Sequence, residues 1–367
     1  MQTHALRDHA SPRIPVHCKT ALLRNFAKVR KSIKNALKLM KKILNKTLKT
    51  LLPLLLGAFI LYMLYEDFDF TQIWSALKEM DMFWFTATTI FIILSHVIRG
   101  LRWKLALAPL GLHPRSSVSI YSIFISYAAN LVVPRVGEVS RCVVLEQYDK
   151  VPFAQSLGTL VTERLIDTIV VIVMTTVAVM LQWPMFLEFV NEVGLKNPLD
   201  GFKNSAVAWI VIILSVIAIA VMLFLLIRKM AIWKKIRSFI TRFSEGLLSL
   251  RKMKHGWLFV IETLAIWFCY LMQFYLCFFY FPFTSGLSFL AGLLMFVSTS
   301  VAVVVPTPNG AGPWHFAVIS FMILYGVSST DASTFAFIVH STQTIIVALL
   351  GIYALIMLQF KKSSNKN

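Results

Sequence analysis

Long runs of apolar residues, broken by short charged segments, constrain this chain more than any other feature. A helix needs about 20 apolar residues to cross the hydrocarbon core of a bilayer, with roughly 17 as the lower limit. Hydrophobic residues make up 57% of the chain and charged residues only 14%, against roughly 25% charged residues in soluble domains. We therefore predict an all-α integral membrane protein. The apolar runs cover residues 51–65, 82–98, 118–133, 151–181, 205–227, 257–281, 286–305, 313–325 and 332–360.

The distribution of charge predicts which loops face the cytoplasm. The net charge is +19, and basic residues concentrate in residues 1–50 and 228–254. Such clusters can contact nucleic acid, but beside apolar spans they more often mark cytoplasmic loops and attract anionic lipid. We expect no nucleic-acid partner. The segments predicted to be cytoplasmic are the N-terminus, the loop with Arg99, Arg102, Lys104 and Arg115, residues 228–256 and the C-terminal tail, whereas 66–81 and 184–204 lie outside.

This pattern divides the chain into a basic N-terminal extension (1–46), a polytopic membrane domain (47–360) and a cytoplasmic tail (361–367). We expect the extension to be partly disordered or to form an amphipathic surface helix over 21–49, which anionic headgroups would attract. Residues 1–39 lack the apolar core of a secretory signal. Met40, followed by two lysines, would serve as an ordinary start for a membrane protein, so residues 1–39 are expected to be an addition.

Two apolar segments must return to the side of the membrane from which they start. Residue 117 is inside, residue 183 is outside, and 151–181 makes one crossing, so 118–150 begins and ends at the cytoplasmic face. By the same reasoning, 286–325 begins and ends outside. We predict about six full spans and two re-entrant hairpins that enter from opposite faces.

The two predicted hairpins also resemble each other in sequence. Residues 124–134 align with residues 296–306 without a gap, and Phe, Ser, Val, Val and Pro match at equal spacing. Chance similarity between apolar segments is the alternative. A repeat that enters from opposite faces is the inverted-repeat plan of secondary transporters, in which broken helices meet near the midplane. The predicted repeat-like halves lie around 118–182 and 286–360.

The returning arm of the first hairpin carries charges that cannot face lipid. Pro134 ends a helix, and Gly137 permits a tight turn. A guanidinium group offers a planar fork of donors that suits a phosphate, and a nearby carboxylate would hold it when no lipid is bound. The alternative is a cytoplasmic loop with structural ion pairs. The candidate headgroup residues here are Asn130, Arg135, Glu138 and Arg141.

A second charged group lies inside the run 151–181. Glu163 is about 18 Å along a helix that starts near Val151, close to the middle of a roughly 30 Å core. Asp167 follows at i+4 on the same face, and Arg164 lies beside them. Charges at that depth face a cavity or partners. Glu163, Arg164 and Asp167 are therefore candidates either for headgroup binding or for a buried network that fixes helix packing.

The third polar group is the tip of the second hairpin, where prolines and glycines leave backbone groups free to bind a headgroup. Asn309 and His315 are its candidate binding residues, although a lone histidine is more often simply hydrogen-bonded. The predicted turn residues are Pro306, Pro308, Gly310 and Gly312.

No nucleophile elbow, Walker A loop, dinucleotide-binding glycine pattern or zinc motif is visible in the sequence. The four cysteines have no metal-ligand spacing, and Cys269 and Cys277 are expected to behave as small core residues. We expect no catalytic residue, metal or cofactor.

The motifs, in this order, resemble the transmembrane domain of the lysylphosphatidylglycerol synthase family, also described as flippase-like membrane proteins. That family has a proline-arginine-x-glycine-glutamate stretch with a following arginine, a glutamate-arginine-x-x-aspartate helix and a late proline- and glycine-rich turn. The matching positions are Pro134, Arg135, Gly137, Glu138 and Arg141, then Glu163, Arg164 and Asp167, then Pro306, Pro308, Gly310 and Gly312. The resemblance covers about residues 45–360.

Two departures affect what the resemblance implies. Asn309 replaces a glycine, and His315 stands where many relatives carry an acid. The larger synthases continue into a soluble aminoacyl-transfer domain, whereas this chain stops soon after Phe360. The resemblance implies the lipid-translocating part without the synthetase.

Taken together, the sequence favours a flippase-like transporter in the cytoplasmic membrane with both termini in the cytoplasm. Its expected substrate is an anionic phospholipid or a polyprenyl-linked lipid. One alternative is an enzyme or subunit of lipid-linked glycosyl transfer, for which Glu138 or Asp167 would have to act as acid or base. Another is a scaffold for a partner enzyme that modifies lipids.

Overall fold

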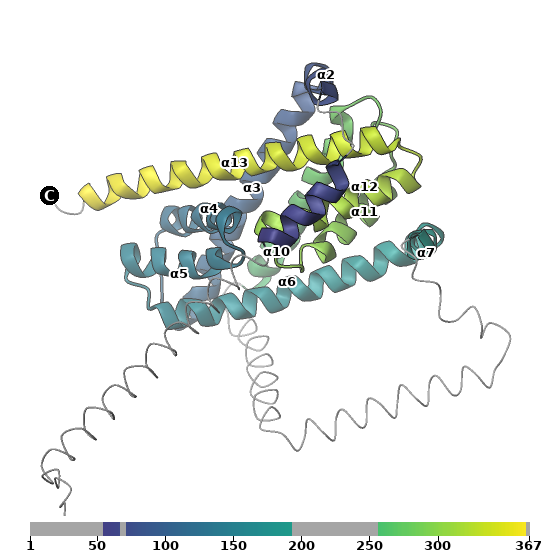
Figure 1. Ribbon diagram of the computed structural model, residues 1–367. Coiled ribbons are helices and arrows are strands. Elements are labelled where there is room, and N and C mark those ends of the chain that lie inside the picture. Colours follow the sequence, from purple (N-terminus) through teal and green to yellow (C-terminus); the bar gives the residue numbers. More distant parts are fainter. Residues whose placement is uncertain (1–53, 67–70, 193–255, 365–367) are drawn as a thin grey trace, which may run out of the picture. The chain divides into compact units, whose positions relative to one another are not determined.

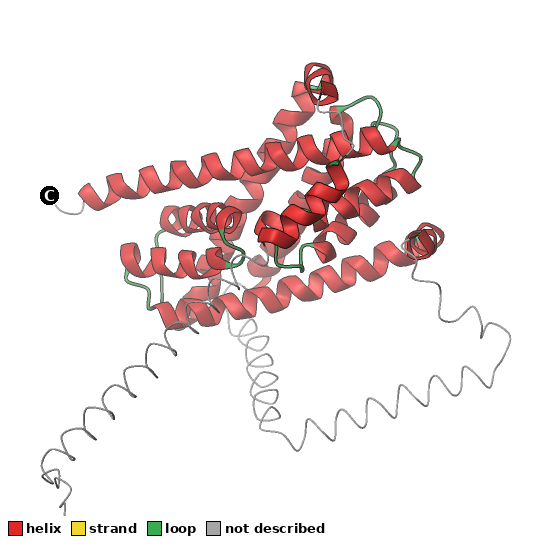
Figure 2. Cartoon of the chain, in the orientation of Figure 1, coloured by secondary structure: helices red, strands yellow, loops and turns green. Residues whose placement is uncertain are grey.

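The computed structural model describes residues 54–66, 71–192 and 256–364, and throughout these ranges it contains helices and loops but no strand (Figures 1 and 2). The N-terminal extension, the apolar run 205–227 and the basic cluster 228–254 lie outside the described residues. In chain order the elements are Leu54–Tyr65, α2 (Thr71–Glu79), α3 (Met82–Leu107), η1 (Ala108–Leu110), α4 (Ser116–Val132), α5 (Val136–Asp149), α6 (Phe153–Leu181), α7 (Trp183–Glu192), α10 (Gly256–Leu276), η2 (Cys277–Tyr280), α11 (Phe289–Ala302), η3 (Pro308–Gly310), α12 (Pro313–Leu324) and α13 (Ser329–Ser364).

Four of the described helices are long and apolar enough to cross a membrane. They correspond to four of the six expected full spans, since the run 51–65 appears as the short helix Leu54–Tyr65 and 205–227 is outside the described residues. The span-length segments are Met82–Leu110, Phe153–Leu181, Gly256–Tyr280 and Ser329–Phe360.

The first of these segments corrects one sequence-based interpretation. The sequence predicts that Arg99 and Arg102 lie in a cytoplasmic loop after residue 98, but α3 continues without a break to Leu107 and buries both side chains. The helix can continue because acidic partners on α6 meet both guanidinium groups. The loop itself begins only after η1.

A pair of packed helices lies in each of the two segments for which a hairpin is predicted. α4 packs against α5, and α11 packs against α12 (Figure 1). The turn between α4 and α5 places Arg135 in the left-handed region at φ 64°, and Asn130 Oδ1 accepts the Gly137 N–H at 2.8 Å. Re-entry into a bilayer and an inverted-repeat relationship stay predictions.

The turns of the two helix pairs lie against each other. η3 lies against α4, and Arg135 Nη2 donates to the Val304 carbonyl at 3.4 Å. α4 itself is held between α3, α5 and α13. Close crossings need small residues, and they occur at Gly100, where a Cβ would fall 2.7 Å from the Ile120 Cα, and at Gly351, where it would fall 2.3 Å from the Ala128 Cβ.

Many of the buried apolar side chains in the described ranges belong to one of two clusters. The larger joins α10, η2, α11, α12 and the first half of α13, and the smaller joins α3, α4, α5 and the start of α6. Cys269 and Cys277 are free and buried in the first of these regions, as expected for small core residues, and Cys142 is buried in the second.

We predict that Gly137→Ala destabilises the protein by about 1–3 kcal/mol, because an added Cβ would lie 1.9 Å from the Ser126 carbonyl oxygen and force α4 and α5 apart. Gly158→Ala is the matched control, since it also lies in a helix but has no atom within 4 Å of the added Cβ. Thermal unfolding of both variants in detergent measures the difference. Equal midpoints would contradict the close packing described for Gly137.

Candidate functional site

Five buried charged side chains from three helices form one ion network. Arg99 and Arg102 come from α3, Arg141 from α5, and Glu163 and Asp167 from α6. All five have at most 6% of their surface exposed. The network therefore ties the returning arm of the first hairpin to two of the span-length helices.

Glu163 is the centre of this network, because it accepts from all three arginines. Its Oε1 lies 3.2 Å from Arg99 Nε and 2.7 Å from Arg102 Nη2, and its Oε2 lies 2.9 Å from Arg141 Nη2. Asp167, one turn further along α6, accepts from Arg102 Nη1 at 2.9 Å and from Arg99 Nη2. The two carboxylates on one face of α6 thus receive the two guanidinium groups of α3.

Neutral side chains complete the surroundings of the arginines. Arg99 Nη1 donates to the hydroxyls of Tyr127 and Tyr270, at 2.8 Å and 2.6 Å. Arg102 Nη1 donates to Thr263 Oγ1 of α10 at 3.1 Å. The Arg141 guanidinium carbon lies 4.4 Å from the centre of the Trp103 ring, a cation–π contact.

The network is not electrically balanced. Three guanidinium groups face two carboxylates, which leaves one positive charge uncompensated among these five residues. Arg141 Nε and Nη1 are both buried, and neither has a hydrogen-bond partner in the described part of the chain. Buried donors without a partner are costly, and in native proteins nearly all buried polar groups are hydrogen-bonded to protein, water or a ligand.

One further ion pair, between Arg164 and Glu138, lies at the accessible edge of the network and is called its rim. Arg164 Nε lies 3.3 Å from Glu138 Oε1, and Arg164 Nη1 lies 3.9 Å from Asp167 Oδ2. The side chains of Arg164 and Glu138 are 40% and 36% exposed. Because this pair is neutral overall, it leaves the excess positive charge of the network unchanged.

The structure brings together some of the sequence-predicted residues and separates others. Arg141, Glu163 and Asp167 lie in the network, and Glu138 and Arg164 form its rim. Asn130 closes the α4–α5 turn, and Arg135 is exposed at the hairpin contact. Glu138 holds Arg164, whereas the sequence suggested that it would hold Arg135 or Arg141.

Asn309 and His315 lie away from the network and hold the tip of the second hairpin. Asn309 is in the left-handed region at φ 52°, and its Nδ2 donates to Thr344 Oγ1 at 2.8 Å. The Gly312 N–H donates to His315 Nδ1 at 3.4 Å. The His315 ring is buried, with its centroid 4.5 Å from that of His340. Both predicted residues therefore have structural partners here.

Arg99 and Arg102 are the network residues that the sequence analysis did not propose. Two arginines three residues apart at the end of an apolar run match the usual sign of a cytoplasmic boundary. The same spacing places both on one face of a continuing helix, opposite the Glu163–Asp167 pair. The sequence did hold a signal for this pairing, because two basic residues in one apolar run and two acidic residues in another are each about one helical turn apart.

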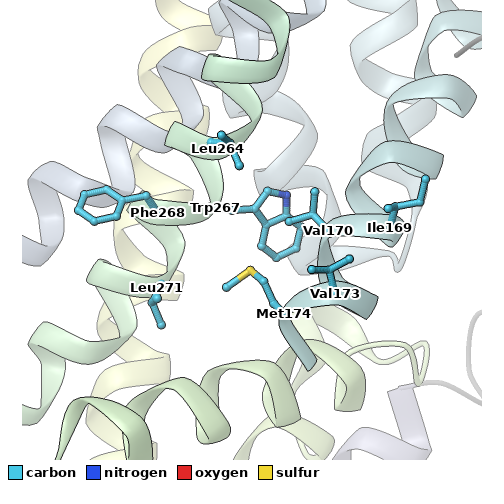
Figure 3. A pocket seen from close by; sticks show the side chains of 8 residues that line it. All are labelled: Ile169, Val170, Val173, Met174, Leu264, Trp267, Phe268 and Leu271. Carbon is cyan, nitrogen blue, oxygen red and sulfur yellow. The ribbon is translucent and has the colours of Figure 1, made fainter. Parts of the chain in front are cut away.

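An apolar cleft begins beside the network, between α6 and α10 (Figure 3). Its volume is about 350 Å³. Ile169 and Val170 follow Asp167 along α6, and Leu264 follows Thr263 along α10, so the cleft and the network share both helices. The lining side chains are Ile169, Val170, Val173, Met174, Leu264, Trp267, Phe268 and Leu271.

Among the residues that the structure describes, no group of three or more His, Cys, Asp or Glu side chains could hold a metal ion. The carboxylates of Glu163 and Asp167 are instead occupied by arginines. The network is therefore cationic overall, with three guanidinium groups against two carboxylates.

Comparison with known proteins identifies the family. The family described as "Lysylphosphatidylglycerol synthase TM region" matches residues 50–351, which include the whole network and both hairpins. The chain belongs to this family. With four span-length helices, it is a multi-pass membrane protein of a family associated with membrane lipids.

One characterised relative is similar to part of the chain. Glycosyltransferase AglD of Haloferax volcanii is 28% identical over 119 residues, which cover 32% of this chain. The match covers 19% of the length of that relative. No solved structure matches the chain.

We predict that Glu163→Gln destabilises the protein by roughly 3–5 kcal/mol, because it removes the carboxylate that three buried arginines share. Glu138→Gln is the control, since it removes a half-exposed pair worth at most about 1 kcal/mol. Unfolding midpoints in detergent give the comparison. Similar small shifts for both variants would mean that Glu163 does not hold the network together.

Proposed function

We propose that this protein moves a lipid with an anionic headgroup between the leaflets of the cytoplasmic membrane. The observation that carries the proposal is the excess positive charge of the buried network, together with the two unpartnered donors of Arg141. A phosphate accepts strong charge-assisted hydrogen bonds from guanidinium N–H groups, so it matches these donors in charge and in hydrogen-bonding capacity.

The rim supplies the route by which a headgroup would reach the network. Arg164 is half-exposed and held by Glu138, and it also touches Asp167. An arriving phosphate would displace the Glu138 carboxylate from Arg164 and then reach Arg141, which shares the Glu163 carboxylate with α3. Displacement of one anion by another leaves the rim charge-balanced during entry.

The apolar cleft supports a lipid, rather than a soluble anion, as the substrate. A headgroup at the network would lie at one end of the cleft, and a hydrocarbon chain would extend along Val170 and Val173. Burying a methylene group contributes about 0.8 kcal/mol. The same arrangement suits an acyl chain or a polyprenyl chain, so both lipid classes belong to the proposal.

A second candidate function is lipid-linked glycosyl transfer, which the similarity to part of Glycosyltransferase AglD favours. Such chemistry needs an acid or base free to exchange a proton with substrate. Asp167 is paired with three arginines and Glu138 with one, which favours transport without a catalytic step. A scaffold for a lipid-modifying partner enzyme would use the same headgroup site.

The proposed topology places both termini in the cytoplasm and makes the two hairpins re-entrant.

Arg164→Gln is expected to slow lipid movement about tenfold, because it removes the cation that meets the headgroup first. The assay follows headgroup-labelled phosphatidylglycerol across proteoliposome membranes. Arg115→Gln is the matched control, since Arg115 is also about two-fifths exposed and paired with an acid, Asp149, but lies outside the network. Equal rates in both variants would remove the network from the mechanism. Sugar transfer without lipid movement in the same vesicles would favour the hypothesis of lipid-linked glycosyl transfer.

The cleft generates a separate prediction. Val173→Trp should fill the cleft and displace part of the bound hydrocarbon chain. Each displaced methylene group loses about 0.8 kcal/mol of burial, which should slow lipid movement about fourfold. Ile172→Trp is the control, because Ile172 is 60% exposed on the same helix and does not line the cleft. Equal slowing by both tryptophans would show that bulk on α6, rather than occupation of the cleft, limits the rate.

A further inference from the structure

Glu262 is an acidic side chain beside the network that belongs to none of its ion pairs. It is the only charged residue of α10 and adjoins Thr263, which accepts a hydrogen bond from Arg102. The side chain is half-buried, and its Oε2 is buried without a hydrogen-bond partner among the described residues. A carboxyl group in an apolar helix of this length is costly and usually functional.

Within the described part of the chain, one charged residue acts on the Glu262 carboxyl. Among the described residues, Arg102 of α3 is the charged group close enough to influence the Glu262 carboxyl. The helices α11 and η2, which also pack against α10, carry no charged residue. The other titratable or charged residues of α3 and α6 near the network have partners of their own: His96, Arg99, Lys104, Glu163, Arg164 and Asp167.

Arg102 and Glu262 hold complementary unpartnered atoms. Arg102 Nε is a buried donor without a partner in the described chain, and Glu262 Oε2 is a buried acceptor in the same condition. A deprotonated Glu262 would supply the one negative charge that the three arginines lack. A protonated Glu262 leaves the positive excess in place, together with the free donors of Arg141.

We propose that Glu262 binds a proton whenever the network binds an anion, so that proton and lipid headgroup are taken up together. This inference rests on the proposed function and adds a coupled ion to it. The proton comes from the aqueous phase, sits on the Glu262 carboxylate and returns to water when the headgroup leaves. The occupied site then carries no net charge, which lowers the cost of holding it at membrane depth.

Linkage makes the coupling measurable from either side. Binding of dihexanoyl phosphatidylglycerol to the detergent-solubilised full chain is measured by calorimetry at about pH 5.5 and about pH 8.5, a range in which a partly buried glutamate can titrate. The phosphodiester stays singly charged throughout this range. Because protonation of Glu262 creates the site for the anion, affinity should fall on the order of tenfold at the higher pH. Buffers with different ionisation enthalpies should report close to one proton taken up per lipid.

Glu262→Gln mimics the protonated state at nearly constant volume. It should bind the lipid tightly at both pH values and take up no proton, whereas Glu79→Gln, at the end of α2, should behave like the wild type. Wild-type affinity that does not change with pH, or a Glu262→Gln variant that keeps the pH dependence, would overturn the coupling while leaving the anion site intact. Absence of lipid binding by the wild type at both pH values would overturn the anion site and this inference with it.

Discussion

Burying guanidinium groups inside a membrane protein is the constraint on which the rest of this structure depends. An unpaired buried charge costs several kcal/mol, so Arg99, Arg102 and Arg141 each require a carboxylate at hydrogen-bond distance. α6 supplies both carboxylates from one face, at Glu163 and Asp167. The distance between α3 and α6 and the direction in which α5 returns are therefore set by the same two side chains. Moving any of these helices by a few ångströms would leave a charge without its partner.

The first hairpin can be understood as the element that delivers Arg141 to this position. α5 must run back along α4 closely enough for Arg141 to reach Glu163, and Gly137 permits that approach to the Ser126 carbonyl. Asn130 closes the turn by accepting the Gly137 N–H. The small residues at the other α4 crossings serve the same end, because they let α3 and α13 hold α4 in place. Local backbone chemistry and the buried charges thus impose one consistent arrangement.

Much of this fold could be predicted from the sequence, because long apolar runs and prolines are local signals. The runs 151–181 and 332–360 became α6 and α13, and a pair of packed helices lies in each segment for which a hairpin is predicted. The pairing of Glu163 with Arg99 could not be predicted in this way, since it joins residues 64 positions apart. A rule that assigns arginines after an apolar run to a cytoplasmic loop carries no information about a partner on another helix. The hydrogen bond between Asn130 and Gly137 could not be predicted for the same reason, because it exists only in the folded turn.

The alternative to a binding site is a network that only fixes the packing of helices, and the charge inventory argues against it. A purely structural network is most stable when charges are equal and every donor is paired, since each unpaired buried donor costs about 1–3 kcal/mol. Here Arg141 leaves two donors unpaired, although Glu262 lies near enough to Arg102 to change the balance. Replacing a buried ion pair by apolar residues often stabilises a protein, so stability alone does not explain three arginines at this place. The proposed anion site would account for them, because a site that accepts an anion and later releases it has to be incomplete when it is empty.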